Sequence, residues 1–206
     1  MKGVILHGGR GTRLRPLTHT GPKQLIPIAN KPMSQYALDN LKEAGINEIA
    51  LILGDVAAEK VVEYYGDGSK FGVKLNYIHQ GEPRGIAHAI GLTEDFVGDE
   101  PFVVYLGDNL LRDGIIDLVK QFESSKPDAQ IVLCKVSNPS AFGVAEVRDG
   151  RIVRLIEKPR VPPSDLALVG VYMFRRSIFD AIKDLKPSGR GELEITDAIQ
   201  QLVDRG

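Results

Sequence analysis

Short apolar runs alternate with segments of mixed polarity along the first two-thirds of the chain. The runs are GVILH, EIALIL, KLNYIH, PFVVYL and AQIVLC, at residues 3–7, 48–53, 74–79, 101–106 and 129–134. Buried strands of this length, separated by longer helical segments, are typical of a largely parallel sheet, because parallel neighbours need a crossover between them. The pattern predicts a Rossmann-like, doubly wound α/β domain with helices on both faces of its sheet.

The segments between these runs carry apolar residues at helical spacing. The spacing predicts helices over residues 36–44, 57–65, 86–96 and 115–122. Gly45 and Gly66 directly follow the first two of these segments, where glycine commonly ends a helix. Ligands of doubly wound sheets bind beyond the carboxyl ends of the strands, so the residues directly after each run are the first candidates for a site.

After Phe142 the pattern becomes antiparallel. The segments VAEV and RIVRLIEK flank the dipeptide Asp149-Gly150, which has the turn chemistry of a tight hairpin. LALVGVYMF predicts a further strand, and helices are expected over 177–185 and 193–203. No linker separates the two parts, so residues 1–206 are expected to form one main domain with a mixed, mostly parallel sheet.

Composition and charge narrow the possible partners. The 206 residues include 26 Lys and Arg and 27 Asp and Glu, so we expect no nucleic-acid surface and no anionic-membrane surface. The sole cysteine, Cys134, lies in the apolar stretch IVLCKV and is expected to be a buried small hydrophobe. The first apolar stretch is too short for a signal peptide or a membrane span, so the expected location is the cytoplasm.

A glycine-rich segment, GGRGTRLRPLT, follows the first predicted strand. Such a loop can bring backbone amides close to phosphate oxygens, and Arg13 would add a guanidinium group, although a turn of unusual backbone geometry also needs glycine. No Gly-Lys-Ser/Thr follows, and Leu14 stands where the dinucleotide fingerprint has its third glycine, which disfavours P-loop enzymes and NAD-dependent oxidoreductases. Lys23 offers a second cation to the same phosphates, but a lone loop lysine is usually just solvated.

At this point the sequence resembles a known family. GGRGTRLRPLT followed by PKQLIPIANKPM is similar to the signature of the sugar-1-phosphate nucleotidyltransferases, which join a nucleoside triphosphate to a sugar 1-phosphate and release pyrophosphate. The blocks YGDGSKFG, YIHQGEPRGIAHA, YLGDN, FGVAEV, EKP and RGELEITDAIQ extend the resemblance in the family's order. Gln24-Leu25 most resembles the thymidylyltransferases, so dTTP and glucose 1-phosphate are the expected substrates, with UTP as the alternative nucleotide.

The resemblance implies a nucleotide side of the site. It assigns Lys23 to the triphosphate, and it assigns Gln80 and Gly85 to the base, where a polar surface loop is the alternative reading. It gives nucleotide contacts to the glycine-loop residues Gly8, Gly9, Gly11, Thr12 and Arg13.

Asp108 is the expected ligand of the cofactor, Mg²⁺. It follows FVVYL at a strand's carboxyl end, and magnesium prefers oxygen ligands, often one or two carboxylates together with substrate phosphates. From the residues alone, a helix cap or turn former is equally compatible. The LGDN resemblance implies the metal role.

The resemblance also implies a sugar-phosphate side. Its expected contacts are Gly143, Glu157, Lys158, Val169 and Arg190, with Lys158 on the sugar's phosphate. Other readings stay open: a hairpin start can require a glycine at 143, Glu157 and Lys158 can be an ordinary exposed pair, and the helix after Arg190 can use its acidic residues structurally.

The chain departs from the family pattern in two places. His7 stands where the family usually has a small residue, so contacts around the base or ribose are expected to differ. Family members carry a second metal-binding aspartate in an LDTG-like block, which does not occur here, so we expect the amino-terminal part of a longer enzyme. The sequence is compatible with a homo-oligomer but does not specify the oligomeric state. A non-catalytic module that binds sugar nucleotides is the competing class.

Overall fold

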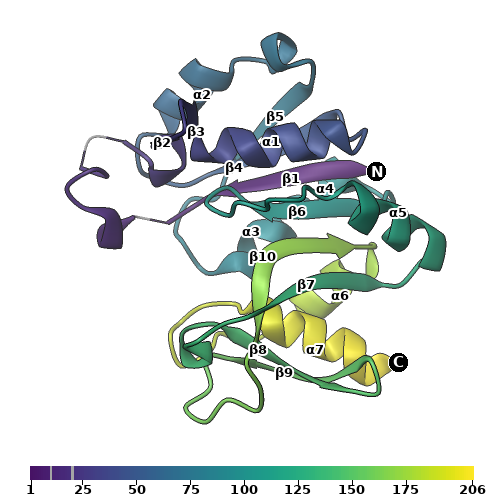
Figure 1. Cartoon of the computed structure of the whole chain (residues 1–206). Coiled ribbons are helices and arrows are strands. Elements are labelled where there is room, and N and C mark those ends of the chain that lie inside the picture. The colour runs from purple at the N-terminus through teal and green to yellow at the C-terminus, as the bar shows by residue number, and fades with distance from the viewer. Residues whose placement is uncertain (10, 20) are drawn as a thin grey trace.

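The computed structural model describes residues 1–9, 11–19 and 21–206 and has a central mixed sheet between two helical layers (Figure 1). All five apolar runs form strands that point in one direction, which confirms the predicted parallel pattern. These strands are β1 (Lys2–His7), β4 (Glu48–Leu53), β5 (Lys74–His79), β6 (Phe102–Leu106) and β7 (Ala129–Lys135).

The second half of the chain completes the sheet in an order that the linear pattern does not show. Strand β10 (Leu166–Phe174) lies between β6 and β7 and is antiparallel to both, so the order is β5-β4-β1-β6-β10, with β7 beyond. Strands β8 (Gly143–Arg148) and β9 (Arg151–Glu157) form the expected hairpin, which joins β10 through one residue pair. Its turn has Asp149 at φ 50° and Gly150 at φ 74°, as a tight hairpin turn requires.

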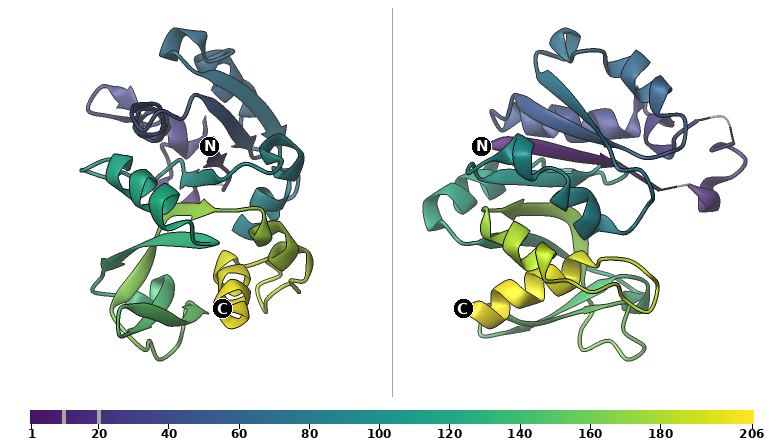
Figure 2. Two further views of the ribbon diagram at one scale, coloured as in Figure 1. Left: turned by 90° about the vertical axis from the view of Figure 1, so that its right-hand side faces the viewer. Right: turned by 180° about the vertical axis from the view of Figure 1, so that it is seen from behind.

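Helices cover both faces of the sheet, as predicted (Figure 2). Because side chains alternate along a strand, the strands β1, β4 and β6 at the centre of the sheet contribute to two apolar cores. One core packs against α1 (Met33–Glu43), α2 (Ala58–Tyr65) and α5 (Ile116–Ser125). The other core packs against α3 (Ile86–Gly91), α4 (Glu94–Val97), α6 (Ser177–Lys183) and α7 (Ile195–Arg205).

Short elements connect these layers. Between β1 and α1 lie two 3-10 helices, η1 (Thr12–Leu14) and η2 (Lys23–Leu25), and a small two-stranded ribbon of β2 (Pro27–Ile28) and β3 (Lys31–Pro32). Two further 3-10 helices, η3 (Ser69–Phe71) and η4 (Pro139–Ala141), precede β5 and β8. No helix of the described residues is long and apolar enough to span a lipid bilayer.

Two sequence predictions were wrong. The single helix expected over 86–96 is split into α3 and α4, because the Thr93 hydroxyl donates to the Ile90 carbonyl at 2.7 Å and competes for it with the helical backbone. Cys134 is exposed rather than buried, since it is one of the last two residues of β7, which are both exposed at the end of the strand.

Candidate active site

The carboxyl ends of the parallel strands meet at one edge of the sheet. Gly8 follows β1, Gly54 follows β4 and Gln80 follows β5. A Cβ on Gly54 would lie 3.3 Å from the Gly8 Cα, and a Cβ on Gly8 would lie 3.1 Å from Gln80 Oε1. Glycine at these two positions therefore lets three strand ends converge tightly.

The glycine loop turns back on itself directly after β1. Gly9 and Gly11 have φ of 94° and 61°, in the left-handed region that favours glycine. The Thr18 hydroxyl donates to the Gly11 carbonyl at 2.8 Å, and a Cβ on Gly11 would lie only 2.7 Å from Thr18 Cγ2. The backbone geometry of the loop thus requires both glycines, whatever they bind.

Lys23 and Asp108 meet although 85 residues separate them. The Lys23 ammonium donates to Asp108 Oδ2, and Asn109 Nδ2 donates to Asp108 Oδ1 at 3.2 Å. Both side chains of the ion pair keep partial exposure, 21% for Lys23 and 31% for Asp108. The resemblance implies that Lys23 binds phosphate and that Asp108 binds a metal ion, and the structure brings these two side chains into direct contact.

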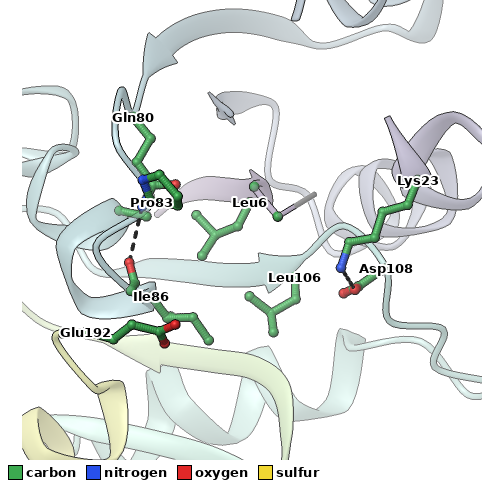
Figure 3. A pocket seen from close by; sticks show the side chains of 12 residues that line it. Leu6, Lys23, Gln80, Pro83, Ile86, Leu106, Asp108 and Glu192 are labelled. Carbon is green, nitrogen blue, oxygen red and sulfur yellow. Dashed lines mark hydrogen bonds and ion pairs between the residues drawn. The ribbon is translucent and has the colours of Figure 1, made fainter. Parts of the chain in front are cut away.

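Two cavities share Gly9, Lys23 and Asp108 in their lining, so both have the ion pair in their walls. Figure 3 shows the first of them. The first cavity, of about 220 Å³, extends from the pair toward Gln80. Its walls are largely apolar and include Leu6, Pro83, Ile86, Ala89 and Leu106. The second cavity, of about 450 Å³, is lined by the expected nucleotide contacts of the glycine loop, Gly11, Thr12 and Arg13, and by Leu14 and Met33.

The far end of the first cavity is built by Gln80 and Gly85. Gln80 Nε2 donates to the Gly85 carbonyl at 3.2 Å, and both residues line the cavity. Gly85 has φ 101°, and a Cβ there would lie 2.5 Å from the Leu193 carbonyl oxygen, so the fold itself demands glycine. Glu192 also lines this cavity; its block, GELEITD, was recognised, but nothing in the sequence marked this carboxylate.

Arg190 and the Glu157–Lys158 pair line a third cavity, of about 450 Å³. The Arg190 guanidinium donates to Glu194 at 2.8 Å and to Glu157 at 3.1 Å, and lies 3.4 Å from Glu192. The Lys158 ammonium lies 3.5 Å from Glu157 and is more exposed. Arg190 thus contacts three carboxylates, whereas among the described residues the Lys158 ammonium pairs only with Glu157 and is more exposed at the same cavity.

Glu194 has a structural role at the start of α7, which is one of the readings that the sequence left open. It is buried at the start of α7, and the Ser188 hydroxyl donates to it at 2.6 Å. Burial, together with the charge of Glu194, raises the pKa of the Asp197 carboxyl on the same cavity wall. The loop between α6 and α7 is therefore tied to the helix through one acidic residue.

Gly143 and Val169 contribute backbone rather than cavity lining. A Cβ on Gly143 would lie 2.5 Å from Thr196 Cγ2 and 3.1 Å from Glu157 Oε2, so glycine permits the close approach of α7. Val169 is half-buried beside Gly170, where an added Cβ would lie 2.5 Å from Asn109 Nδ2. Neither residue lines the third cavity, and the Val169 segment lies instead beside Asn109, the neighbour of Asp108 in the chain.

His7 lies away from the expected base or ribose contacts. It is 4% exposed and lines neither the first nor the second cavity, because Leu6 and Gly8 occupy the cavity side of β1. Burial lowers its pKa to about 3, against the opposing charge of Asp108. The imidazole is therefore neutral at physiological pH.

The donor set at Asp108 suits magnesium. The described residues contain no cluster of three or more His, Cys, Asp or Glu side chains that could hold a metal ion. Asp108 offers carboxylate oxygens, which are hard ligands, and one of them accepts a hydrogen bond from the Lys23 ammonium. A magnesium ion that takes one carboxylate and completes its shell with phosphate oxygens and water fits this geometry.

Comparisons with known proteins agree with the resemblance seen in the sequence. Residues 2–206 match the family model described as nucleotidyl transferase. The chain is 58% identical over 207 residues to the low-salt glycan biosynthesis nucleotidyltransferase Agl11 of Haloferax volcanii, and 54% identical over 208 residues to a glucose-1-phosphate thymidylyltransferase of Streptomyces antibioticus. Each comparison covers 100% of this chain but 58% of the relative, so the chain spans little more than half of their length.

Solved structures give the same picture. A crystal structure from Bacillus anthracis, described as a glucose-1-phosphate thymidylyltransferase in complex with a sucrose, superposes with a TM-score of 0.94 at 43% identity, covering 100% of this chain and 84% of that one. A UDP-glucose pyrophosphorylase complexed with UDP-glucose gives 0.89 at 28% identity, covering 100% and 87%. Proteins named for either thymidylyl or uridylyl transfer thus share this fold.

Proposed function

Because the chain belongs to the nucleotidyl transferase family, we propose that it carries the substrate-binding part of a sugar-1-phosphate nucleotidyltransferase. The reaction transfers a nucleotidyl group from a nucleoside triphosphate to a hexose 1-phosphate and releases pyrophosphate. The best candidates for the two substrates are dTTP and glucose 1-phosphate.

One observation supports this proposal above the others. The Lys23–Asp108 ion pair lies in the walls of both an apolar cavity that ends at the Gln80 side chain and a second cavity lined by Gly9, Gly11 and Arg13. A planar base needs the first environment, and a triphosphate needs the second. A nucleotide spanning both cavities would place its α-phosphate next to Asp108.

The residues then divide the work as follows. Gln80, with the Gly85 backbone, binds the edge of the base, and the loop amides at Gly8, Gly9 and Gly11 bind phosphate oxygens. Thr12 and Arg13 extend the phosphate site along the second cavity. On the sugar side, Glu157 accepts hydrogen bonds from sugar hydroxyls and Lys158 binds the phosphate, while Gly143, Val169 and Arg190 shape the subsite.

Catalysis consists mainly of bringing two anions together. A phosphate oxygen of the sugar 1-phosphate attacks the α-phosphorus in line, the bond to the bridging oxygen breaks, and pyrophosphate leaves with both electrons of that bond. Asp108 would hold a magnesium ion, which would neutralise charge on the α-phosphate. Lys23 exchanges Asp108 for the triphosphate, and Lys158 orients the attacking phosphate. No general base is required.

The choice of nucleotide rests on a smaller set of residues. Gln24, which with Leu25 resembles the thymidylyltransferases, is 1% exposed and donates through Nε2 to the Gly8 carbonyl at 2.8 Å. It therefore influences the nucleotide through the glycine loop rather than by lining the base cavity. UTP is the alternative nucleotide, and a sugar-nucleotide-binding module without turnover is the alternative class.

Pyrophosphate release tests the proposal. Each of dTTP, UTP, ATP and GTP is mixed with glucose 1-phosphate, galactose 1-phosphate or mannose 1-phosphate in the presence of Mg²⁺. We expect the fastest release with dTTP and glucose 1-phosphate and the next fastest with UTP. Equal release with ATP or GTP would contradict the assigned specificity, and binding of both substrates without release by a chain extended to the relatives' full length would favour the non-catalytic alternative.

A further inference from the structure

Three buried polar atoms lie together beneath the glycine loop. The two ring nitrogens of His7 and the Oε1 atom of Gln24 have no hydrogen-bond partner among the described residues. His7 is 4% exposed and Gln24 is 1% exposed. Leaving such groups without hydrogen bonds in the interior destabilises a protein. Unpaired atoms of two neighbouring side chains therefore indicate a hydrogen-bond partner common to both.

The side chains of His7 and Gln24 both lie beside Gly107. A Cβ on Gly107 would lie 3.3 Å from His7 Cδ2 and 3.2 Å from Gln24 Cγ. The His7 ring also packs against the Tyr65 ring, edge to face, with centroids 6.0 Å apart. The imidazole is thus fixed beside Gly107, next to the residue that carries the metal-binding carboxylate in the proposed function.

Gln24 connects this interior to the loop. Its Nε2 atom donates to the Gly8 carbonyl at 2.8 Å, so Oε1 must face inward. The Ser34 hydroxyl holds the Gln24 backbone carbonyl at 3.1 Å and lies 2.7 Å from the Tyr65 hydroxyl. The backbone of Gln24 is therefore anchored, while its inward-facing oxygen still needs a donor.

We propose that His7 is a positioning residue that donates, through one internal water molecule, to Gln24 Oε1 and so fixes the carboxamide that holds the Gly8 carbonyl. A neutral imidazole has one donor and one acceptor, and a buried water typically makes about three hydrogen bonds, so this link satisfies Gln24 Oε1 and one of the two ring nitrogens. The Gly8 carbonyl then keeps one direction, and the following amide of Gly9 faces the phosphates. The phosphate end of this inference rests on the proposed function.

Substitutions at both ends of the link test it through dTTP binding measured by calorimetry. His7→Phe keeps a ring but has no donor, and we expect it to weaken dTTP binding about tenfold while glucose 1-phosphate binding stays unchanged. His7→Gln restores a donor and should recover most of that loss. In a Gln24→Leu background His7→Phe should cause no further loss, because the link is already absent. His19→Phe, at an exposed histidine of the same loop, is the control and should match the wild type.

Nuclear magnetic resonance of ¹⁵N-histidine-labelled wild type tests the link without any substrate. We expect the His7 ring to be a single neutral tautomer whose N–H exchanges slowly with solvent and loses this protection in Gln24→Leu. An unprotected ring N–H in the wild type, or equal losses of dTTP affinity in His7→Phe and His7→Gln, would overturn the inference. If the wild type binds neither dTTP nor UTP, the proposed function fails, and the ring signal still decides whether the link exists.

Discussion

Two cations, Lys23 and Arg190, are held in opposite ways on the two sides of the site. Lys23 pairs with the single carboxylate of Asp108, and both partners keep part of their surface in solvent. Arg190 contacts three carboxylates, of which Glu194 is buried and hydrogen-bonded to Ser188 as well. Lys23 can therefore exchange Asp108 for another anion at a small cost in free energy, whereas Arg190 cannot leave its carboxylates as readily.

The difference teaches which charges are available for chemistry. A partly exposed ion pair contributes about 0 to 1 kcal/mol, so an incoming phosphate and a cation can replace both halves of the Lys23–Asp108 pair. Removing one partner of a buried ion pair leaves a charge without compensation and destabilises the fold. We therefore expect Lys23 and Asp108 to act on substrates, and Arg190 to hold Glu157 and the loop before α7 in place.

Asp108→Asn should produce the largest effect of any single change. It removes the negative charge that would hold the metal ion, and we expect turnover to fall at least about 100-fold with the melting temperature nearly unchanged. Pyrophosphate release and thermal unfolding are the measurements. Asp113→Asn, at an exposed carboxylate paired with Arg112, is the matched control and should keep full activity. Wild-type turnover in Asp108→Asn would move the metal site elsewhere.

Arg190→Ala should act mainly on stability. It leaves the buried Glu194 without its cation, and we expect the free energy of unfolding to fall by about 1 to 3 kcal/mol. Urea denaturation measures this. Arg112→Ala removes an ion pair in which both side chains are largely exposed, and it should leave the free energy of unfolding nearly unchanged. An equal loss of stability in Arg190→Ala and Arg112→Ala would contradict the structural role assigned to Arg190.

Lys158→Ala separates the sugar side from the nucleotide side. Its ammonium is 44% exposed beside Glu157, so its loss should not destabilise the fold. We expect glucose 1-phosphate binding to weaken about tenfold while dTTP binding stays the same, because only the sugar's phosphate meets this charge. Calorimetry with each ligand decides the point, and a larger loss of dTTP affinity would contradict the assignment.

Lowering the pH should destabilise the folded state through His7. Burial lowers the pKa of the folded imidazole to about 3, whereas an unfolded histidine titrates near 6.5. Between these values the unfolded chain binds a proton that the folded chain does not, so stability is lost as pH falls through this window, by up to about 1.4 kcal/mol per pH unit. Urea denaturation from pH 7 to pH 4 should show a shallower loss in His7→Gln, and identical slopes would contradict the burial of a neutral ring.

The sequence predicted much of the fold because periodicity is a local property. Every apolar run became a strand, and Asp149-Gly150 formed the expected turn with both residues at positive φ. The position of β10 between β6 and β7 was beyond this reasoning, since strand order depends on contacts between distant segments. Thr93 split a predicted helix through a side-chain hydrogen bond that periodicity does not register.

For the candidate site, the sequence selected individual residues but not the contacts between them. Motif resemblance selected Lys23, Asp108 and Arg190 individually, and the matching family model confirms the family itself. Nothing in the linear sequence indicated that Lys23 pairs with Asp108, that three carboxylates surround Arg190, or that His7 faces the interior. Those facts depend on which strand ends converge and on which face of β1 each side chain lies.

Manganese binding in the absence of nucleotide tests the central claim most directly. If Lys23 occupies the cation position on Asp108, Lys23→Ala should bind Mn²⁺ alone about two- to fivefold more tightly than the wild type while it binds dTTP more weakly. Electron paramagnetic resonance of free Mn²⁺ measures the first quantity and calorimetry the second, with Lys23→Ala/Asp108→Asn as the control that should lose the gain. Unchanged or weaker Mn²⁺ binding by Lys23→Ala would contradict the account, because the Lys23 ammonium and the metal ion would then not compete for the Asp108 carboxylate.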